Sequence, residues 1–379
     1  MVRFRDHPRV DAPSSTTSDA PRKLKRPKDM SVEAVRGLAA LLMVAGHVIG
    51  NTADRGMKVG DDSLWRLFYL GLEDIRMPLF TVISGYVYAM RPVERRDDFP
   101  QLVRGKSRRL LLPLLTVGAL LFAMKMLIPA ANTRPELGDF WKTYVYGYEH
   151  LWFLEAIFLV FLAVALLGIA GALSTLPKWC ATTGVAFILY TVVSVPEAAN
   201  VFSMNGALRL LPFFLLGYGM YQFELFQLNR WGIAGAAALF VSIYTIKLAS
   251  LIGDWEPNEI VRRIVSVAVG VSGIVLIFAA RKVFTWRWLA WVGGFAFGIY
   301  LLHVFGSAAT RIALEKVGIG WLPAVFVVGL VVGVGAPIVF QLLFGRWNIV
   351  RTFVLGEKPI PRTTRREVAS GTVEEPNAR

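Results

Sequence analysis

Two polar side chains stand out in an otherwise apolar stretch near the start of the chain. Arg36 and His47 lie within residues 31–50, SVEAVRGLAALLMVAGHVIG, which is long enough to cross a bilayer as one helix. Eleven residues at 100° each make three turns plus about 20°, so the two side chains share a helix face about 16 Å apart. Charged and titratable groups are costly in hydrocarbon. Their shared face therefore predicts a polar path into the membrane, where we would look first for chemistry.

The composition indicates which class of protein carries this helix. Of 379 residues, 55% are hydrophobic, and the mean hydropathy is +0.51, which is too apolar for an ordinary soluble domain. The single cysteine, Cys180, excludes an intramolecular disulfide and a multi-thiolate metal site. Four histidines leave little room for a histidine cluster, and we expect no bound metal. The first 30 residues contain no apolar core typical of a cleavable signal.

Apolar runs recur along the chain and predict an all-α polytopic integral membrane protein with about ten transmembrane helices. The predicted spans are residues 31–50, 67–90, 109–128, 151–170, 180–196, 207–223, 232–251, 261–280, 288–306 and 321–345. Charged residues fall within two of them, namely Glu73, Asp74 and Arg76 in the second span and Arg209 in the sixth. No soluble domain of useful size lies between the spans.

The distribution of charge predicts the orientation of the chain. With the N-terminus inside, most of the 41 Lys and Arg residues fall on inner segments, whereas the outer segments carry similar numbers of bases and acids. The positive-inside rule therefore places both termini in the cytoplasm, and it explains the net charge of +14 without nucleic-acid binding.

Three segments follow from this pattern. We expect a disordered basic cytoplasmic tail at residues 1–30, a transmembrane domain at residues 31–345 and a mostly disordered cytoplasmic tail at residues 346–379. The basic run RKLKRPK at residues 22–28 is suited to rest on anionic headgroups of the lipid bilayer.

Five segments in chain order resemble signatures of the membrane acyltransferase-3 family. The first, VRGLAALLMVAGH, contains Arg36 and His47 and resembles the family's R-x10-H motif. The next two are RMPLFTVISGYVYAM (76–90), which is similar to the family's FFxxSGY second helix, and KSRRLLLP (106–113), which is similar to its basic loop before the third helix. The last two, HLWFLEAIF (150–158) and FGIYLLH (297–303), are similar to the family's later helices. The resemblance covers residues 30–345, and ten spans with the N-terminus inside is the family's arrangement.

The resemblance implies an enzyme, an acyltransferase that moves a short acyl group, commonly acetyl, from cytoplasmic acyl-coenzyme A to an acceptor. Family acceptors are usually hydroxyls of cell-surface glycans, although some members modify lipids, antibiotics or other small molecules. The implied co-substrate is acyl-coenzyme A, with no permanently bound cofactor, and the implied location is the inner membrane of a bacterium. A cytoplasmic donor and an external acceptor require a protein-lined route, and the Arg36–His47 face spans part of one.

His47 is the candidate general base for this reaction. An alcohol must lose its proton as it attacks a thioester carbonyl, and imidazole titrates near neutral pH. The alternative is a histidine hydrogen-bonded for helix packing. The resemblance also assigns Arg36 to the donor's phosphates, whose oxygens its fork of N–H donors matches. Otherwise, Arg36 is a flanking charge paired with Glu33 one turn earlier.

A basic loop is expected to hold the rest of the donor. Residues 91–109 include seven bases: Arg91, Arg95, Arg96, Arg104, Lys106, Arg108 and Arg109. Coenzyme A carries a 3′-phosphate and a pyrophosphate, and we assign Lys106 and Arg109, one turn apart, to them. Setting topology is the alternative for most of the seven. Ser84 is a further donor-binding candidate, with a packing role beside Gly85 as its alternative.

The acceptor is expected to contact His150, Trp152 and Tyr300 near the outer ends of their spans. Aromatic side chains in the loop at 129–149 also suit a glycan, because they stack on sugar faces. Trp152 and these aromatics equally suit the aromatic belt of a membrane protein.

Glu155 and His303 are additional catalytic candidates. His150 and Glu155 are five residues apart, about 140° around a helix, so they do not form a simple dyad. Glu155 falls in an apolar register and would need a partner such as Arg209 or His47. His303 is a second possible acid or base, and a structural role is the alternative for it and for His150.

Two other classes of function remain open on the sequence. A secondary transporter would use Arg36, His47, Glu155 and Arg209 to relay protons or bind an anion, although no pair of broken helices recurs in two halves. A non-catalytic lipid- or partner-binding protein would tolerate the loss of His47.

Overall fold

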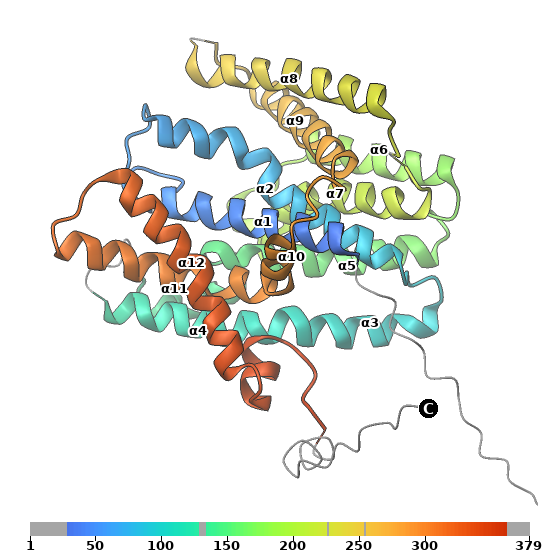
Figure 1. Cartoon of the computed structure of the whole chain (residues 1–379). Coiled ribbons are helices and arrows are strands. Elements are labelled where there is room, and N and C mark those ends of the chain that lie inside the picture. The colour runs from blue at the N-terminus through green and yellow to red at the C-terminus, as the bar shows by residue number, and fades with distance from the viewer. Residues whose placement is uncertain (1–28, 129–133, 226, 254, 362–379) are drawn as a thin grey trace, which may run out of the picture.

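The computed structural model describes residues 29–128, 134–225, 227–253 and 255–361, and within these ranges the secondary structure is entirely helical (Figure 1). The α-helices are α1 (Met30–Ile49), α2 (Leu64–Ala89), α3 (Phe99–Lys106), α4 (Leu112–Leu127), α5 (Trp152–Ile169), α6 (Leu176–Val192), α7 (Met204–Gln222), α8 (Arg230–Ile252), α9 (Glu259–Ala279), α10 (Arg287–Gly294), α11 (Ala296–Lys316) and α12 (Leu322–Phe344). Turns of 3-10 helix occur at Arg96–Asp98, Leu137–Tyr144, Glu149–Leu151, Glu197–Ala199 and Val201–Ser203, and π-helical turns at Ser107–Leu111 and Val350–Val354. Most of both predicted tails, residues 1–28 and 362–379, lies outside the described residues.

The all-α fold is confirmed for the described part of the chain, where eight helices or continuous helical runs are long and apolar enough to cross a membrane. Two of the predicted spans are not among these eight. The helix α2 carries Glu73, Asp74 and Arg76 in its middle, and α6 has 17 residues. The count of ten spans and the orientation of the termini stay predictions.

One predicted boundary is wrong. The span expected at 288–306 is two helices, because α10 ends at Gly294 and α11 begins at Ala296 and continues to Lys316. At Gly293 the backbone lies so close to α1 that a Cβ atom there would overlap the carbonyl oxygen of Glu33. Packing against α1 thus sets the direction of α10 separately from that of α11. Apolar periodicity alone does not reveal this break.

The starts of several helices follow from local sequence. The side chains of Asp29, Ser63, Asn229 and Asn258 each accept a hydrogen bond from a backbone N–H in the first turn of α1, α2, α8 and α9, respectively. Such caps satisfy N–H groups that have no partner within the helix. Helices α3, α4, α6 and α12 instead have proline in the first turn, where its missing N–H has no cost.

Glycines set the most extensive helix contact in the bundle. The helix α2 packs most extensively against α7. A Cβ atom at Gly85 would overlap the carbonyl oxygen of Phe214, and one at Gly217 would overlap that of Val82. Membrane helices associate through such small residues because lipid supplies little hydrophobic drive between them. The glycine pair therefore holds α2 and α7 backbone to backbone.

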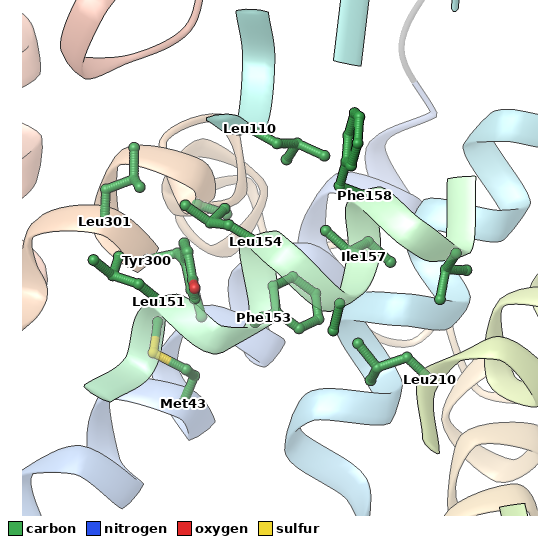
Figure 2. Close-up of a cluster of buried hydrophobic side chains, with 14 of the residues drawn as sticks. Met43, Leu110, Leu151, Phe153, Leu154, Ile157, Phe158, Leu210, Tyr300 and Leu301 are labelled. Carbon is green, nitrogen blue, oxygen red and sulfur yellow. The ribbon is translucent and has the colours of Figure 1, made fainter. Parts of the chain in front are cut away.

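The helix α5 lies at the centre of the core (Figure 2). Leu154 and Ile157 of α5 are almost fully buried. Around them Figure 2 shows Met43 from α1, Leu210 from α7 and Leu301 from α11. The segment just before α5 is thereby held at a fixed place relative to α1 and α11.

The helix α8 lies at one edge of the bundle beside α9 (Figure 1). Only 6% of the residues in the most apolar stretch of α8 are buried inside the protein, so its apolar side chains are left to face lipid. Unlike its neighbours on α8, Lys247 is buried in the protein, where it forms an ion pair with Asp74 of α2. This pair fastens the edge helix to the bundle.

Candidate active site

Three histidines from distant parts of the chain converge. The ring centroids of His47 and His303 are 4.7 Å apart, those of His150 and His303 4.9 Å, and those of His47 and His150 6.0 Å. They come from α1, from the 3-10 turn before α5, and from α11. The expectation that four histidines leave little room for a cluster is therefore wrong. Single residues far apart in the sequence carry no signal of a contact that only helix packing creates.

The three rings differ in their access to the surroundings. His150 and His303 are buried, with 3% and 0% of their surface exposed. His47 is exposed, and in α1, all of which the structure describes, it is the one exposed residue after Met30. Its ring makes no hydrogen bond to any described residue. His47 thus presents its side chain to an open space.

The backbone assigns the tautomers of the two buried rings. Nδ1 of His303 faces the carbonyl oxygens of Ile299 at 3.1 Å and Tyr300 at 2.9 Å, and Nε2 of His150 faces that of Leu301 at 3.3 Å. A carbonyl oxygen only accepts, so these nitrogens carry the protons. Nε2 of His303 and Nδ1 of His150 then hold lone pairs, and both are buried with no hydrogen-bond partner among the described residues.

The open space beside His47 is a cavity of about 310 Å³, which we call the histidine cavity. It is bounded by residues of α1, α2, α4, α11 and α12 and by the segment that leads into α5. His47, His150 and Trp152 line it, as do Arg55 and Glu149. Its volume lies in the range of small-molecule sites, about 300–1,000 Å³.

Charged side chains form the polar part of this cavity. Glu149 accepts a hydrogen bond from Arg55 at 3.0 Å and forms a second ion pair with Lys125 of α4. Tyr300, which was expected to contact the acceptor, lies behind His150, where its hydroxyl donates to the His150 carbonyl oxygen at 2.6 Å. Of the three predicted acceptor contacts, the histidine cavity therefore brings together His150 and Trp152.

Arg76 was expected as a charge inside the second span and as the first residue of segment 76–90, with no role of its own in the site. It is 7% exposed, and its guanidinium lies 4.1 Å from the ring centroid of Tyr69, which lines the histidine cavity. A Cβ atom at Gly46 would overlap Nη1 of Arg76, so the charge lies against the backbone next to His47. Within the described chain it has no ion-pair or hydrogen-bond partner. A buried cation without such a partner is costly. Its place beside His47 therefore makes Arg76 a candidate functional residue.

Glu155 does not have the partner that was expected. It is fully buried, and Oε2 accepts a hydrogen bond from the Ser203 hydroxyl at 2.6 Å, while Oε1 has no partner among the described residues. The expected partners His47 and Arg209 do not pair with it. Nη2 of Arg209 lies 3.4 Å from Oδ1 of Asp74 instead, because α7 turns Arg209 toward α2.

The predicted donor residues gather at the Arg36 end of α1. Nη1 of Arg36 donates to Glu33 at 2.8 Å, which is the pairing that the alternative reading of Arg36 anticipated. The charge of Arg36 acts on Arg109, and the charge of Arg109 acts on Lys106. Nζ of Lys106 lies 3.3 Å from the ring centroid of Phe161.

Arg109 is held by the chain beyond α12. Its Nη1 donates to the Leu355 carbonyl oxygen at 2.8 Å and lies 3.5 Å from a carboxylate oxygen of Glu357. Its guanidinium also covers the ring of Phe297 at 4.1 Å. Part of the predicted C-terminal tail, up to residue 361, is thus described, and it folds back onto the basic segment.

The remaining candidates are placed away from these clusters. The hydroxyl of Ser84 donates to the Phe80 carbonyl oxygen at 2.9 Å within α2. Cys180 is exposed on α6. No group of three or more His, Cys, Asp or Glu side chains in the described ranges is arranged to hold a metal ion.

A family model described as an acyltransferase domain, Acyl_transf_3, matches residues 30–341, from the first residue of α1 to near the end of α12. No curated protein and no solved structure matches the chain.

The exposure of His47 predicts that a cysteine at this position reacts with a charged thiol reagent. In a Cys180→Ser background, we expect His47→Cys to be labelled by a cationic methanethiosulfonate and Met43→Cys, one turn earlier and 2% exposed, to stay unlabelled. Intact-protein mass spectrometry measures both. A His47→Cys protein that stays as unlabelled as Met43→Cys would show that no cavity opens at His47.

Proposed function

The chain belongs to the acyltransferase-3 family, and on that premise we propose that it is a membrane-embedded O-acyltransferase. It would move a short acyl group, such as acetyl, from cytoplasmic acyl-coenzyme A to a hydroxyl of a cell-surface glycan or related acceptor. The observation that carries this proposal is His47, an imidazole open to a cavity from an otherwise buried helix. The apolar helices indicate a multi-pass membrane protein, and we assign it to the inner membrane of a bacterium.

The proposed donor site lies at the other end of α1. The charge of Arg109 interacts there with Lys106 and with Arg36, and guanidinium groups suit phosphate oxygens. A carboxylate of Glu357 now faces Arg109, and a donor phosphate would replace it. Eleven residues of α1, about 16 Å, then separate the phosphates from His47, a distance that the extended pantetheine arm is suited to span.

The proposed reaction at the histidine cavity is a direct transfer. The acceptor hydroxyl oxygen attacks the thioester carbonyl carbon while His47 takes the hydroxyl proton. The tetrahedral intermediate collapses with cleavage of the carbon–sulfur bond, and the leaving thiolate takes the proton back from His47. The products are the acyl ester and free coenzyme A, and no further reactant is needed.

Two sets of neighbours support His47 in this role. The rings of His303 and His150 flank that of His47, and their lone pairs have no hydrogen-bond partner in the described chain, so they suit holding one tautomer of His47 by accepting its N–H, directly or through water. The cation of Arg76 lies against the adjacent backbone and suits the negative charge that develops on the carbonyl oxygen.

Loss of the base should abolish transfer. With acetyl-coenzyme A as donor and methyl β-D-glucoside and methyl β-D-glucuronide as acceptor probes, we expect His47→Ala to lower the rate of thiol release by about 10²–10⁴-fold. Met43→Ala, a buried neighbour on α1, is the matched control and should retain activity. Retention of full activity by folded His47→Ala protein would contradict the proposal, and solute accumulation in proteoliposomes without thiol release would favour the transporter alternative.

Arg76 should act on the chemical step rather than on donor affinity. We expect Arg76→Gln to lower kcat by about 10²–10³-fold, the usual effect of removing an oxyanion donor, with little change in KM for acetyl-coenzyme A. Arg76→Lys keeps the charge and should recover part of the loss. Thermal midpoints of all three proteins check folding, and equal activity of wild type and Arg76→Gln would remove Arg76 from the reaction.

A further inference from the structure

A second, larger cavity lies at the His47 end of the bundle, and neither the sequence motifs nor the proposed transfer step uses it. Its volume is about 790 Å³, compared with about 310 Å³ for the histidine cavity. Residues of α2, α6, α7, α8 and α9 surround it, together with the loops before α5 and α7. A cavity of this size accommodates a ligand of one or two sugar residues, because small-molecule sites occupy about 300–1,000 Å³.

One short segment separates the two cavities. Trp152 lines both of them, Gly147 lines the second cavity, and Glu149 lines the histidine cavity. Gly147 has a φ of +72°, and a Cβ atom there would lie 2.9 Å from the Cβ atom of Trp152. This shared segment, which we call the Trp152 wall, has one face toward each cavity.

The floor of the second cavity is a fixed ionic network. Asp74 accepts hydrogen bonds from Lys247 of α8 and Ser266 of α9, and Arg209 of α7 lies 3.4 Å from it. Buried ion pairs of this kind are stable only when each charge is compensated. The network joins four helices and leaves Asp74 with no capacity to attract a cationic ligand.

The rim of the second cavity carries an uncompensated positive charge. Arg263 donates to the carbonyl oxygens of Tyr190 and Val193 and forms an ion pair with Glu259 at 2.6 Å. The exposed side chain of Arg262 has no such partner within the described ranges. Among the described residues that line the cavity, four cations face three acids, so the site has a net charge of +1.

Aromatic side chains complete the lining. Tyr146 and Tyr190 line the second cavity with Trp152, and aromatic faces pack against the apolar faces of sugar rings. An acidic sugar is recognised by aromatic side chains that pack against its ring and by a cation that binds its acidic group. A guanidinium is suited to this, since it binds a carboxylate through two parallel N–H donors.

From this arrangement we propose that the second cavity binds an acidic sugar residue of the acceptor, with its carboxylate on Arg262, while the neighbouring residue presents its hydroxyl to His47 across the Trp152 wall. The presentation of the neighbouring hydroxyl to His47 rests on the proposed acyl transfer. The acidic-sugar site itself stands on the geometry and charge of the second cavity. The protein would then select anionic glycans over neutral ones.

Binding of a matched pair of probes to the detergent-purified full chain tests the site without any turnover. Methyl β-D-glucuronide and methyl β-D-glucoside differ only in the carboxylate. By isothermal titration calorimetry we expect the glucuronide to bind at least tenfold more tightly than the glucoside. We expect Arg262→Gln to abolish that preference. Arg230→Gln removes the same charge at the other end of the α8–α9 pair, and it should leave the preference unchanged.

The outcomes separate the site from the reaction. His47→Ala should bind the glucuronide like the wild type while losing transfer. Equal affinity of the wild type for both glycosides, or an unchanged preference in Arg262→Gln, would overturn the acidic-sugar site, whether or not transfer occurs. Inorganic phosphate that binds as tightly as the glucuronide would overturn it as well, by reducing the cavity to a general anion site. The remaining outcome is a wild type that prefers the glucuronide in a way that depends on Arg262 and yet transfers no acyl group. That result would uphold the acidic-sugar site and overturn the acyl-transfer proposal instead.

Discussion

The free energy cost of leaving a polar group unpaired inside an apolar body is the constraint on which this structure depends. The bundle satisfies it in most places, as in the ion pair of Lys247 with Asp74. Unsatisfied buried atoms are therefore informative. Three of them, Nε of Arg76, Nδ1 of His150 and Nε2 of His303, belong to side chains that surround or adjoin His47. A cation and two lone pairs around one accessible imidazole make a site at which charge can develop and a proton can move.

The helix α5 and the loop before it give this site its shape. The core around Leu154 and Ile157 joins α5 to α1, α7 and α11 (Figure 2). The 3-10 turn before α5 and the first turn of α5 carry His150 and Trp152, which line the histidine cavity, and α5 also carries Glu155, which accepts a hydrogen bond from Ser203. The buried helix α5 thereby fixes His150 and the Trp152 wall relative to the second cavity. Sites built on such elements are held more accurately than sites on free loops.

Some of this arrangement could be predicted from the sequence and some could not. Helical period and length alone place Arg36 and His47 on one face of one span, and local composition yields most helix positions. The meeting of His47 with His303 depends on the packing of α1 against α11, which leaves no trace in either segment. Arg76 shows a different limit, because a charge inside a predicted span looks the same whether it borders lipid or lies beside a reacting group. The ionic partner of Arg209 likewise follows from the rotation of α7, not from its sequence.

The proposed donor site and the histidine cavity lie at the two ends of α1: phosphates of the donor would bind at Lys106 and Arg109, and its acyl group would reach His47. The most direct test is a structure of the protein with a thioether analogue of acetyl-coenzyme A that cannot lose its acyl group. The account predicts phosphate density at Lys106 and Arg109, with the Glu357 carboxylate displaced, and the acyl end within contact distance of the His47 ring. An acyl end that lies outside the histidine cavity, with His47 unchanged, would contradict it.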